Sequence, residues 1–268
     1  MAPRLSQHFL QDRSVAARIA DSVSASEGSR VVEIGPGRGA LTGPLLARGF
    51  RVLAIELDRG LAAGLRERWG TEGGFELLEA DALEVTLPPA RPSERLWVVG
   101  NLPYAITSPI LFHVLDQVDS AGIAEMVFMV QREVAERLAG EPGTRAYGAL
   151  TVGVRLVADV ERLFDVRAGA FRPPPAVVSS VVRLTPHERF GLDEAHRERM
   201  RTIVQALFGQ RRKQIQKSLR TLEAFSLTPE AVDRVALRSG LDLARRPETL
   251  SPEEFLALDV ALTDTGKP

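Results

Sequence analysis

The chain has 268 residues, of which 44% are hydrophobic and 26% are charged, and its formal net charge at pH 7 is −1. This composition is typical of a globular protein with one large domain, or one domain and a smaller appendage. No apolar run approaches the ~20 residues that span a bilayer, and residues 1–12 lack the apolar stretch of a secretory signal, so we expect a cytoplasmic protein without a membrane segment. The absence of cysteine excludes disulfides, thiolate metal sites and a cysteine nucleophile, and the four histidines lack metal-site spacing, so we expect no metal.

Two elements are predicted at the start of the chain. Asp12 is a typical helix cap, and apolar residues recur at helical spacing from Val15 to Val23, which predicts a helix there. A short apolar run over 31–34 then predicts a buried strand.

A glycine-rich turn follows this strand. Gly35, Gly37 and Ala40 fit the G-x-G-x-x-G/A pattern, in which glycines let the backbone approach a ligand closely. The next predicted strand ends at Glu56, whose carboxylate can accept both hydroxyls of a ribose. The turn and the acid together predict a bound nucleoside cofactor, and they leave NAD and S-adenosylmethionine both open.

The fourth predicted strand, an apolar run over 96–99, leads through a glycine into Asn-Leu-Pro-Tyr. Pro103 fixes its own φ and biases Leu102 towards an extended conformation, so that nearby carbonyls can point outwards. Together with the Asn101 side-chain oxygen, such a carbonyl can hold the hydrogens of an –NH₂ group on a planar ring. Tyr104 can stack on that ring, which is worth roughly 1–3 kcal/mol per base. The alternative is an ordinary turn, because asparagine and proline are common in turns.

This loop favours one of the two cofactors. An aromatic amine is a weak nucleophile because its lone pair is delocalised, and two acceptors on its hydrogens favour a pyramidal nitrogen that can attack. Such a nitrogen needs an electrophilic group, which S-adenosylmethionine carries as its methyl group and NAD does not. Asp81, after the third predicted strand, could accept a hydrogen bond from the adenine amine of the cofactor. The sequence therefore predicts an S-adenosylmethionine-dependent methyltransferase.

The middle of the chain continues the alternation of strands and helices. Helices are predicted over 107–118, 132–139 and 147–157, and strands over 126–130, 160–166 and 177–184. The whole pattern predicts an α/β fold with a Rossmann-like, mostly parallel seven-stranded sheet, whose last pair contains an antiparallel member. We expect this domain to cover 1–186 and a small all-helical domain to cover 187–268.

Basic residues are concentrated in the second predicted domain. Seven of them and no acidic residue lie between Arg199 and Leu222, so this segment carries +7 and the rest of the chain −8. A run of charge is usually a solvated face, but the absence of any acid favours contact with phosphates and salt-sensitive binding. The residues expected to bind RNA are Arg211, Arg212, Lys213, Lys217 and Arg220.

Over nearly its whole length the chain resembles the ribosomal RNA adenine dimethyltransferases, most closely the small-subunit (16S) enzymes. The resemblance rests on Gln-His-Phe-Leu at 7–10, Glu-Ile-Gly-Pro-Gly-Arg-Gly at 33–39, Glu56, Asp-Ala at 81–82, Asn-Leu-Pro-Tyr at 101–104, and Phe-Arg-Pro-Pro-Pro-Ala-Val-Val-Ser at 171–179. One departure is Ser6, which stands where the resemblance leads us to expect glycine.

The resemblance implies a class I methyltransferase fold and N6,N6-dimethylation of adjacent adenosines near the 3′ end of 16S rRNA, within a 30S subunit or its precursor. It places Phe171 opposite Tyr104, so that two aromatic rings hold the flipped adenine; a core position for Phe171 is the alternative. The expected catalytic residues are Asn101, Leu102, Tyr104 and Phe171. The expected cofactor-binding residues are Gln7, His8, Leu10, Glu33, Gly35, Gly37, Glu56, Asp81, Ala82 and Asn101.

Three other functions stay open at this point. A large-subunit rRNA adenine methylase of the antibiotic-resistance type shares much of the pattern. A protein glutamine methyltransferase would also hold an amide –NH₂, but it would leave the basic segment without a role. A mainly non-catalytic ribosome-assembly factor would need only the RNA contact. For the small-subunit enzyme we expect a monomer.

Overall fold

The structure is a computed structural model that describes residues 8–89 and 94–263. Its internal contacts divide the chain into two compact units. The first unit comprises the chain up to Ala135 together with Asp159–Pro186, and the second comprises Glu136–Ala158 together with the chain from His187 onwards.

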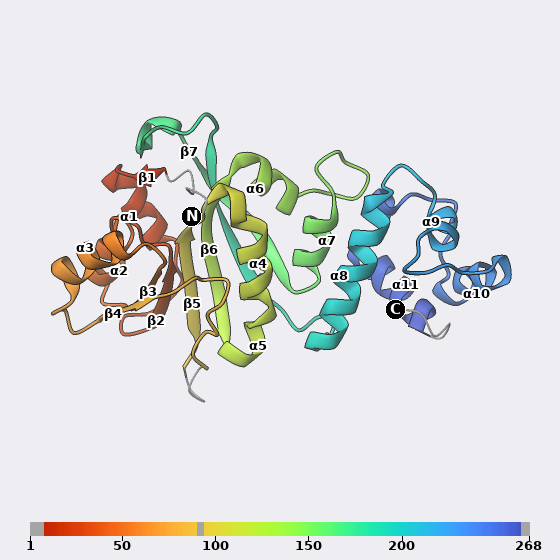
Figure 1. Ribbon diagram of the computed structural model, residues 1–268, viewed down its shortest axis with the longest axis horizontal. Helices are drawn as coiled ribbons and strands as arrows, with labels where there is room; N and C mark the ends of the chain where they lie inside the picture. The colour runs from red at the N-terminus through yellow and green to blue at the C-terminus, as the bar shows by residue number, and fades with distance from the viewer. Residues whose placement is uncertain (1–7, 90–93, 264–268) are drawn as a thin grey trace. The chain divides into compact units, whose positions relative to one another are not determined.

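A seven-stranded sheet forms the centre of the first unit over the described residues, in the order β4-β3-β2-β5-β6-β9-β7 (Figure 1). Strands β2 to β6 are mutually parallel where they pair, and β9 runs antiparallel to β6. The predicted mostly parallel sheet with a late antiparallel strand is therefore confirmed. The strands are β2 (Arg30–Ile34), β3 (Arg51–Glu56), β4 (Phe75–Glu79), β5 (Leu96–Asn101), β6 (Ile123–Gln131), β7 (Ala158–Val166) and β9 (Ser179–Pro186).

Helices form four of the connections between successive strands over the described residues, as is usual for crossovers between parallel strands. The Asp12 carboxylate accepts from Ser14 N and Val15 N and begins the first helix where the sequence predicts it. Ile19 of that helix packs with Val31 and Val99 of the sheet in one buried cluster. The helical segments up to β7 are α1 (Arg13–Asp21), α2 (Thr42–Ala47), α3 (Arg59–Trp69), η1 (Tyr104–Ile106), α4 (Thr107–Asp116), α5 (Val118–Ala121), α6 (Arg132–Leu138) and α7 (Ala149–Arg155).

A separate two-stranded ribbon joins the start of the chain to the connection between β7 and β9. Strand β1 (Phe9–Leu10) pairs antiparallel with β8 (Phe171–Arg172), which follows η2 (Ala168–Ala170). The ribbon continues into two backbone bonds to Ala170 O, from Gln11 N at 2.8 Å and from Asp12 N at 3.3 Å. These bonds fix the segment that leads into α1.

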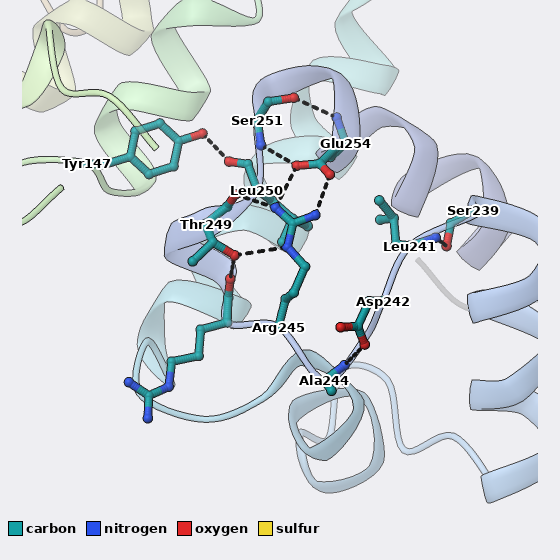
Figure 2. Close-up of polar contacts among 11 residues, drawn as sticks. Tyr147, Ser239, Leu241, Asp242, Ala244, Arg245, Thr249, Leu250, Ser251 and Glu254 are labelled. Carbon is teal, nitrogen blue, oxygen red and sulfur yellow. Dashed lines mark hydrogen bonds and ion pairs between the residues drawn. The ribbon is translucent and has the colours of Figure 1, made fainter. Parts of the chain in front are cut away.

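Helices alone make up the second unit over the described residues from His187 onwards, as predicted. They are α8 (Glu194–Gly209), α9 (Ile215–Thr221), α10 (Pro229–Ser239), η3 (Pro247–Thr249) and α11 (Pro252–Thr263). Phe208 of α8 stacks on Phe255 of α11 with ring centroids 5.9 Å apart, so aromatic rings form part of the core of this unit. Ion pairs between Arg245 and Glu254 link the approach to η3 with α11 (Figure 2).

The predicted domain boundary is wrong in one respect: residues 136–158, assigned to the first domain, belong to the second unit. Tyr147 is fully buried there, and its hydroxyl donates to Leu250 O at 2.6 Å (Figure 2). Gly143 N donates to Glu248 O at 2.7 Å. Helical periodicity in the sequence identified α7 but did not show which core its apolar face joins.

Candidate active site

A cavity of about 600 Å³ lies at the carboxyl edge of the sheet, where ligands bind in open α/β folds. The segments that follow β2, β3, β4 and β5 all reach it, and β1 closes one side. The structure thus brings together most of the predicted site. The predicted residues that line the cavity are His8, Leu10, Glu33, Gly35, Gly37, Glu56, Asp81, Ala82, Asn101, Leu102 and Tyr104. Gln7 lies outside the described residues.

The glycine-rich turn presents backbone to this cavity. Gly35 and Gly37 have φ of +63° and +59°, a region that side chains disfavour. Gly35 N donates to Ile55 O at 3.0 Å, which ties the turn to β3. A Cβ built on Gly35 would meet no atom within 4 Å, although Gly35 lines the cavity. The turn therefore leaves space that a ligand can fill against bare backbone.

Glu56 is held rigidly at the end of β3. Its side chain is only 4% exposed, and its two oxygens accept from Gly37 N and Asp58 N, each at 2.9 Å. Each carboxylate oxygen can accept more than one hydrogen bond, so Glu56 keeps acceptor capacity towards the cavity. Leu57, the next residue, is 51% exposed and adds an apolar surface that the sequence analysis did not single out.

Two further acids line the same cavity. Glu33 is fully buried and accepts from the Thr42 hydroxyl at 2.6 Å. Burial raises the pKa of Glu33 to about 7, against the effect of this hydrogen bond and with a smaller contribution from the charge of Glu56. Asp81 is half-buried and accepts from Leu83 N at 2.9 Å, which fixes its carboxylate beside the cavity.

The Asn-Leu-Pro-Tyr loop leaves two oxygen acceptors without a donor among the described residues. Asn101 Nδ2 donates to His8 O at 3.2 Å, which orients the amide and leaves its oxygen without a donor among the described residues. Leu102 N donates to Met129 O at 3.1 Å and its side chain is 1% exposed, so the residue is fixed on the sheet. Pro103 O accepts from Ile106 N and from the Thr107 hydroxyl, whereas Leu102 O accepts from no described residue. Asn101 Oδ1 and Leu102 O are thus the two open acceptors.

Tyr104 is oriented by a residue that sequence reasoning gave no role. Its hydroxyl lies 2.8 Å from the hydroxyl of Ser179, a fully buried residue at the start of β9. Burial raises the pKa of the Tyr104 phenol, so it stays neutral. The His8 ring lies 5.6 Å from the Tyr104 ring, tilted by 31°, and its Nδ1 is 2.9 Å from Pro173 O. Only the motif around Ser179 could have pointed to this residue.

The predicted clamp between Tyr104 and Phe171 is wrong. Phe171 is 3% exposed, belongs to the hydrophobic core of the first unit and is not among the residues that line the cavity. Its partner in the ribbon is Leu10, and both side chains join that core. The aromatic neighbour of Tyr104 at the cavity is His8.

The basic residues of the second unit divide into two groups. Arg211 forms an ion pair with Glu248 and donates to Arg145 O at 3.1 Å and Thr144 O at 3.0 Å. Its guanidinium group is therefore engaged in contacts within the second unit. Its predicted role in RNA binding is therefore not supported. Four other predicted RNA-binding residues are exposed: Arg212, Lys213, Lys217 and Arg220.

With the geometry established, comparison with known proteins identifies the family. A family model described as "Ribosomal RNA adenine dimethylase" matches residues 1–258. The chain belongs to the ribosomal RNA adenine dimethylase family. This match confirms both the predicted family and the predicted methyltransferase class.

Relatives and solved structures agree with membership of the dimethylase family. A Nitrosococcus oceani protein named ribosomal RNA small subunit methyltransferase A is 45% identical, over 95% of this chain and 93% of its own. A protein of the same name from Acinetobacter baylyi is 41% identical, over 95% and 90%. A dimethyladenosine transferase structure from Plasmodium falciparum has a TM-score of 0.79 at 25% identity, over 97% and 99%. The 23S rRNA methyltransferase ErmE has a TM-score of 0.67 at 30% identity, over 95% and 99%.

Two further observations concern the parts of this dimethylase that the structure describes. No group of three or more histidine, aspartate or glutamate side chains there is arranged to hold a metal ion. No helix there has the length and apolar character needed to cross a bilayer.

Proposed function

We propose that the chain uses S-adenosylmethionine to dimethylate N6 of adjacent adenosines near the 3′ end of 16S rRNA, in a 30S subunit or its precursor. The observation that carries the proposal is the pair of open acceptors, Asn101 Oδ1 and Leu102 O, in the same cavity as the glycine-rich turn. The small-subunit substrate is supported by relatives that are 45% and 41% identical and are named for that subunit. With a ribosomal substrate, the proposed site of action is the cytoplasm.

The residues of the cavity fit S-adenosylmethionine. Bare backbone at Gly35 leaves room for the amino acid tail of the cofactor, because no atom lies within 4 Å of a Cβ built there. Glu56 can accept the ribose hydroxyls, and Asp81 can accept the adenine amine, with Leu57 as an apolar surface beside them. When bound, S-adenosylmethionine supplies an electrophilic methyl group.

The loop after β5 prepares the amine of the target adenine. Two acceptors on the amine hydrogens favour a pyramidal nitrogen, whose lone pair then becomes available for attack. Tyr104 provides the face on which the base stacks, and the hydrogen bond to Ser179 holds that face in one orientation. After transfer, the nitrogen is acidic enough to release its proton to solvent. Positioning, which can supply roughly 7–11 kcal/mol, is therefore the main contribution of the chain.

The second unit supplies cations for the RNA. Arg212, Lys213, Lys217 and Arg220 are exposed on α9 and on the turn before it. Their contacts would be with phosphates, because exposed lysine and arginine side chains bind the backbone without reading sequence.

The decisive experiment uses labelled S-adenosylmethionine and unmethylated 30S particles, followed by mapping of the modified nucleotide. We expect dimethyladenosine near the 3′ end of 16S rRNA. Asn101→Ala should abolish transfer while leaving cofactor binding nearly unchanged, and Gln205→Ala, which removes an exposed amide from α8, should behave as wild type. Equal methyl incorporation by Asn101→Ala and wild type would refute the role of Asn101.

A large-subunit target is the second candidate, because ErmE shares the fold at 30% identity. Parallel incubation with 50S particles and 23S rRNA tests this alternative. Methylation confined to 23S rRNA would replace the proposed substrate and leave the methyltransferase class unchanged.

A further inference from the structure

Two arginines lie beside Phe9, a residue that lines the cavity. Arg38, which lies within the glycine-rich turn and lines the cavity, places its guanidinium carbon 4.7 Å from the centroid of the Phe9 ring. Arg172 lies directly opposite Phe9 in the ribbon of β1 and β8. Residues directly opposite in an antiparallel pair project from the same face, so Arg172 and Phe9 share one side of the ribbon. The two arginines thus lie beside one aromatic ring.

Neither arginine has an acidic partner among the described residues, and both are exposed. Several other arginines of the same unit form ion pairs with acidic side chains. Arg30, Arg48 and Arg51 pair with Glu76, Asp21 and Glu94, and Arg66 pairs with Glu79. Arg38 and Arg172 are therefore available to an anion from outside the chain.

We infer that Arg38 and Arg172 bind phosphates of the RNA strand on either side of the target adenosine. This inference rests on the proposed function, since it concerns the substrate of the same cavity. The target base enters the cavity, while the phosphates that flank it stay at the rim. Arginine suits this contact because its planar fork matches a phosphate, and stacking on Phe9 holds Arg38 in place before the RNA arrives.

The same position allows one competing role for Arg38. Because Arg38 lines the cavity, it could bind the carboxylate of the cofactor instead of a phosphate. Two measurements distinguish these roles. Loss of a cofactor contact would lower the affinity for S-adenosylmethionine, whereas loss of a phosphate contact would change the salt dependence of RNA binding.

The test compares the double variant Arg38→Ala/Arg172→Ala with a matched control, Arg68→Ala/Arg95→Ala. Arg68 also stacks on an aromatic ring, that of Trp69 at 4.3 Å, and Arg95 is exposed just before β5. Neither control residue lines the cavity. Binding to a 16S rRNA 3′-terminal fragment is measured by filter retention between 50 and 200 mM salt, and S-adenosylmethionine binding by calorimetry.

For two lost phosphate contacts, the slope of log affinity against log salt should become shallower by about 1.4–1.8. The control should keep the wild-type slope, and wild type, Arg38→Ala/Arg172→Ala and the control should bind S-adenosylmethionine within about twofold of one another. An unchanged slope in Arg38→Ala/Arg172→Ala, an equal change in the control, or a loss confined to cofactor affinity would each overturn the inference. If wild type methylates 16S rRNA and the slope of Arg38→Ala/Arg172→Ala equals that of wild type, only this inference is refuted. Wild-type protein that neither binds nor methylates 16S rRNA would refute the proposed function as well.

Discussion

Alanine at two glycines of the same turn should affect different properties: Gly39→Ala mainly the stability of the fold, and Gly35→Ala mainly the binding of the cofactor. Both have positive φ, +63° at Gly35 and +77° at Gly39, so each alanine variant carries a backbone cost of roughly 1–2 kcal/mol. A Cβ on Gly39 would also lie 2.2 Å from the ring of Trp69, a buried side chain, whereas a Cβ on Gly35 meets nothing within 4 Å. Overpacking of this kind typically costs a further ~1–3 kcal/mol. Gly39→Ala should therefore lose about 2–5 kcal/mol of unfolding free energy, and Gly35→Ala about 1–2.

The effects on the cofactor should be reversed. A methyl group on Gly35 enters the cavity, while Gly39 is not among the residues that line it. Gly35→Ala should therefore weaken S-adenosylmethionine binding, and folded Gly39→Ala should keep most of its affinity. Urea unfolding gives the stability of each variant, and calorimetry below the transition gives the affinity. Equal losses of stability in the two variants would contradict the assigned contact with Trp69, and unchanged cofactor affinity in Gly35→Ala would contradict the placement of the cofactor.

Three further predictions follow from hydrogen bonds and burial. Ser179→Ala and Tyr104→Phe should each lower methyl transfer, and the double variant should lose less than the sum of the two, because both remove the same hydrogen bond; additive losses in a double-mutant cycle would refute the coupling. Burial raises the pKa of Glu33 from an ordinary 4.5 to about 7 in the folded protein. The neutral side chain therefore contributes its full share to the free energy of unfolding below pH 4.5, and roughly 3 kcal/mol of that free energy is lost as pH rises through 7. Glu33→Gln should therefore gain stability over wild type as pH rises from 5 to 8 in urea unfolding, and a constant difference would exclude this titration. Arg211→Ala should destabilise the protein by roughly 1–3 kcal/mol, whereas Arg212→Ala should keep wild-type stability and weaken RNA binding; the reverse result in thermal melts and filter binding would overturn the division between the two arginines.

The sheet and its loops were predictable because strand patterns fix where parallel strands end. Glu56, Asp81 and Asn101 each follow an apolar run, and the carboxyl ends of parallel strands lie on one edge, so their meeting in one cavity needed no further information. An antiparallel member in the last pair of strands was also predicted, but its pairing with β6 was not.

Side-chain partners from distant segments were not predictable. Phe171 and Leu10 pair across the ribbon and enter the core together, and no local pattern around Phe171 distinguishes this position from one in the cavity. Arg211 and Arg212 are neighbours of the same charge, yet only Arg211 meets Glu248, a residue far along the chain. Helical periodicity likewise predicted that α7 is a helix. It did not predict the unit to which α7 belongs, because that depends on the contact between Tyr147 and Leu250.

The ribbon of β1 and β8 has a consequence for the order in which the enzyme becomes competent during its synthesis. Strand β1 emerges from the ribosome first, but a two-residue strand has little stability without its partner. Its partner strand, Pro173 that bonds to His8, and Ser179 that orients Tyr104 all come from a segment translated much later. A nascent chain that has completed the parallel strands still lacks one wall of its cavity, so the enzyme gains its complete site only after β9 has been added.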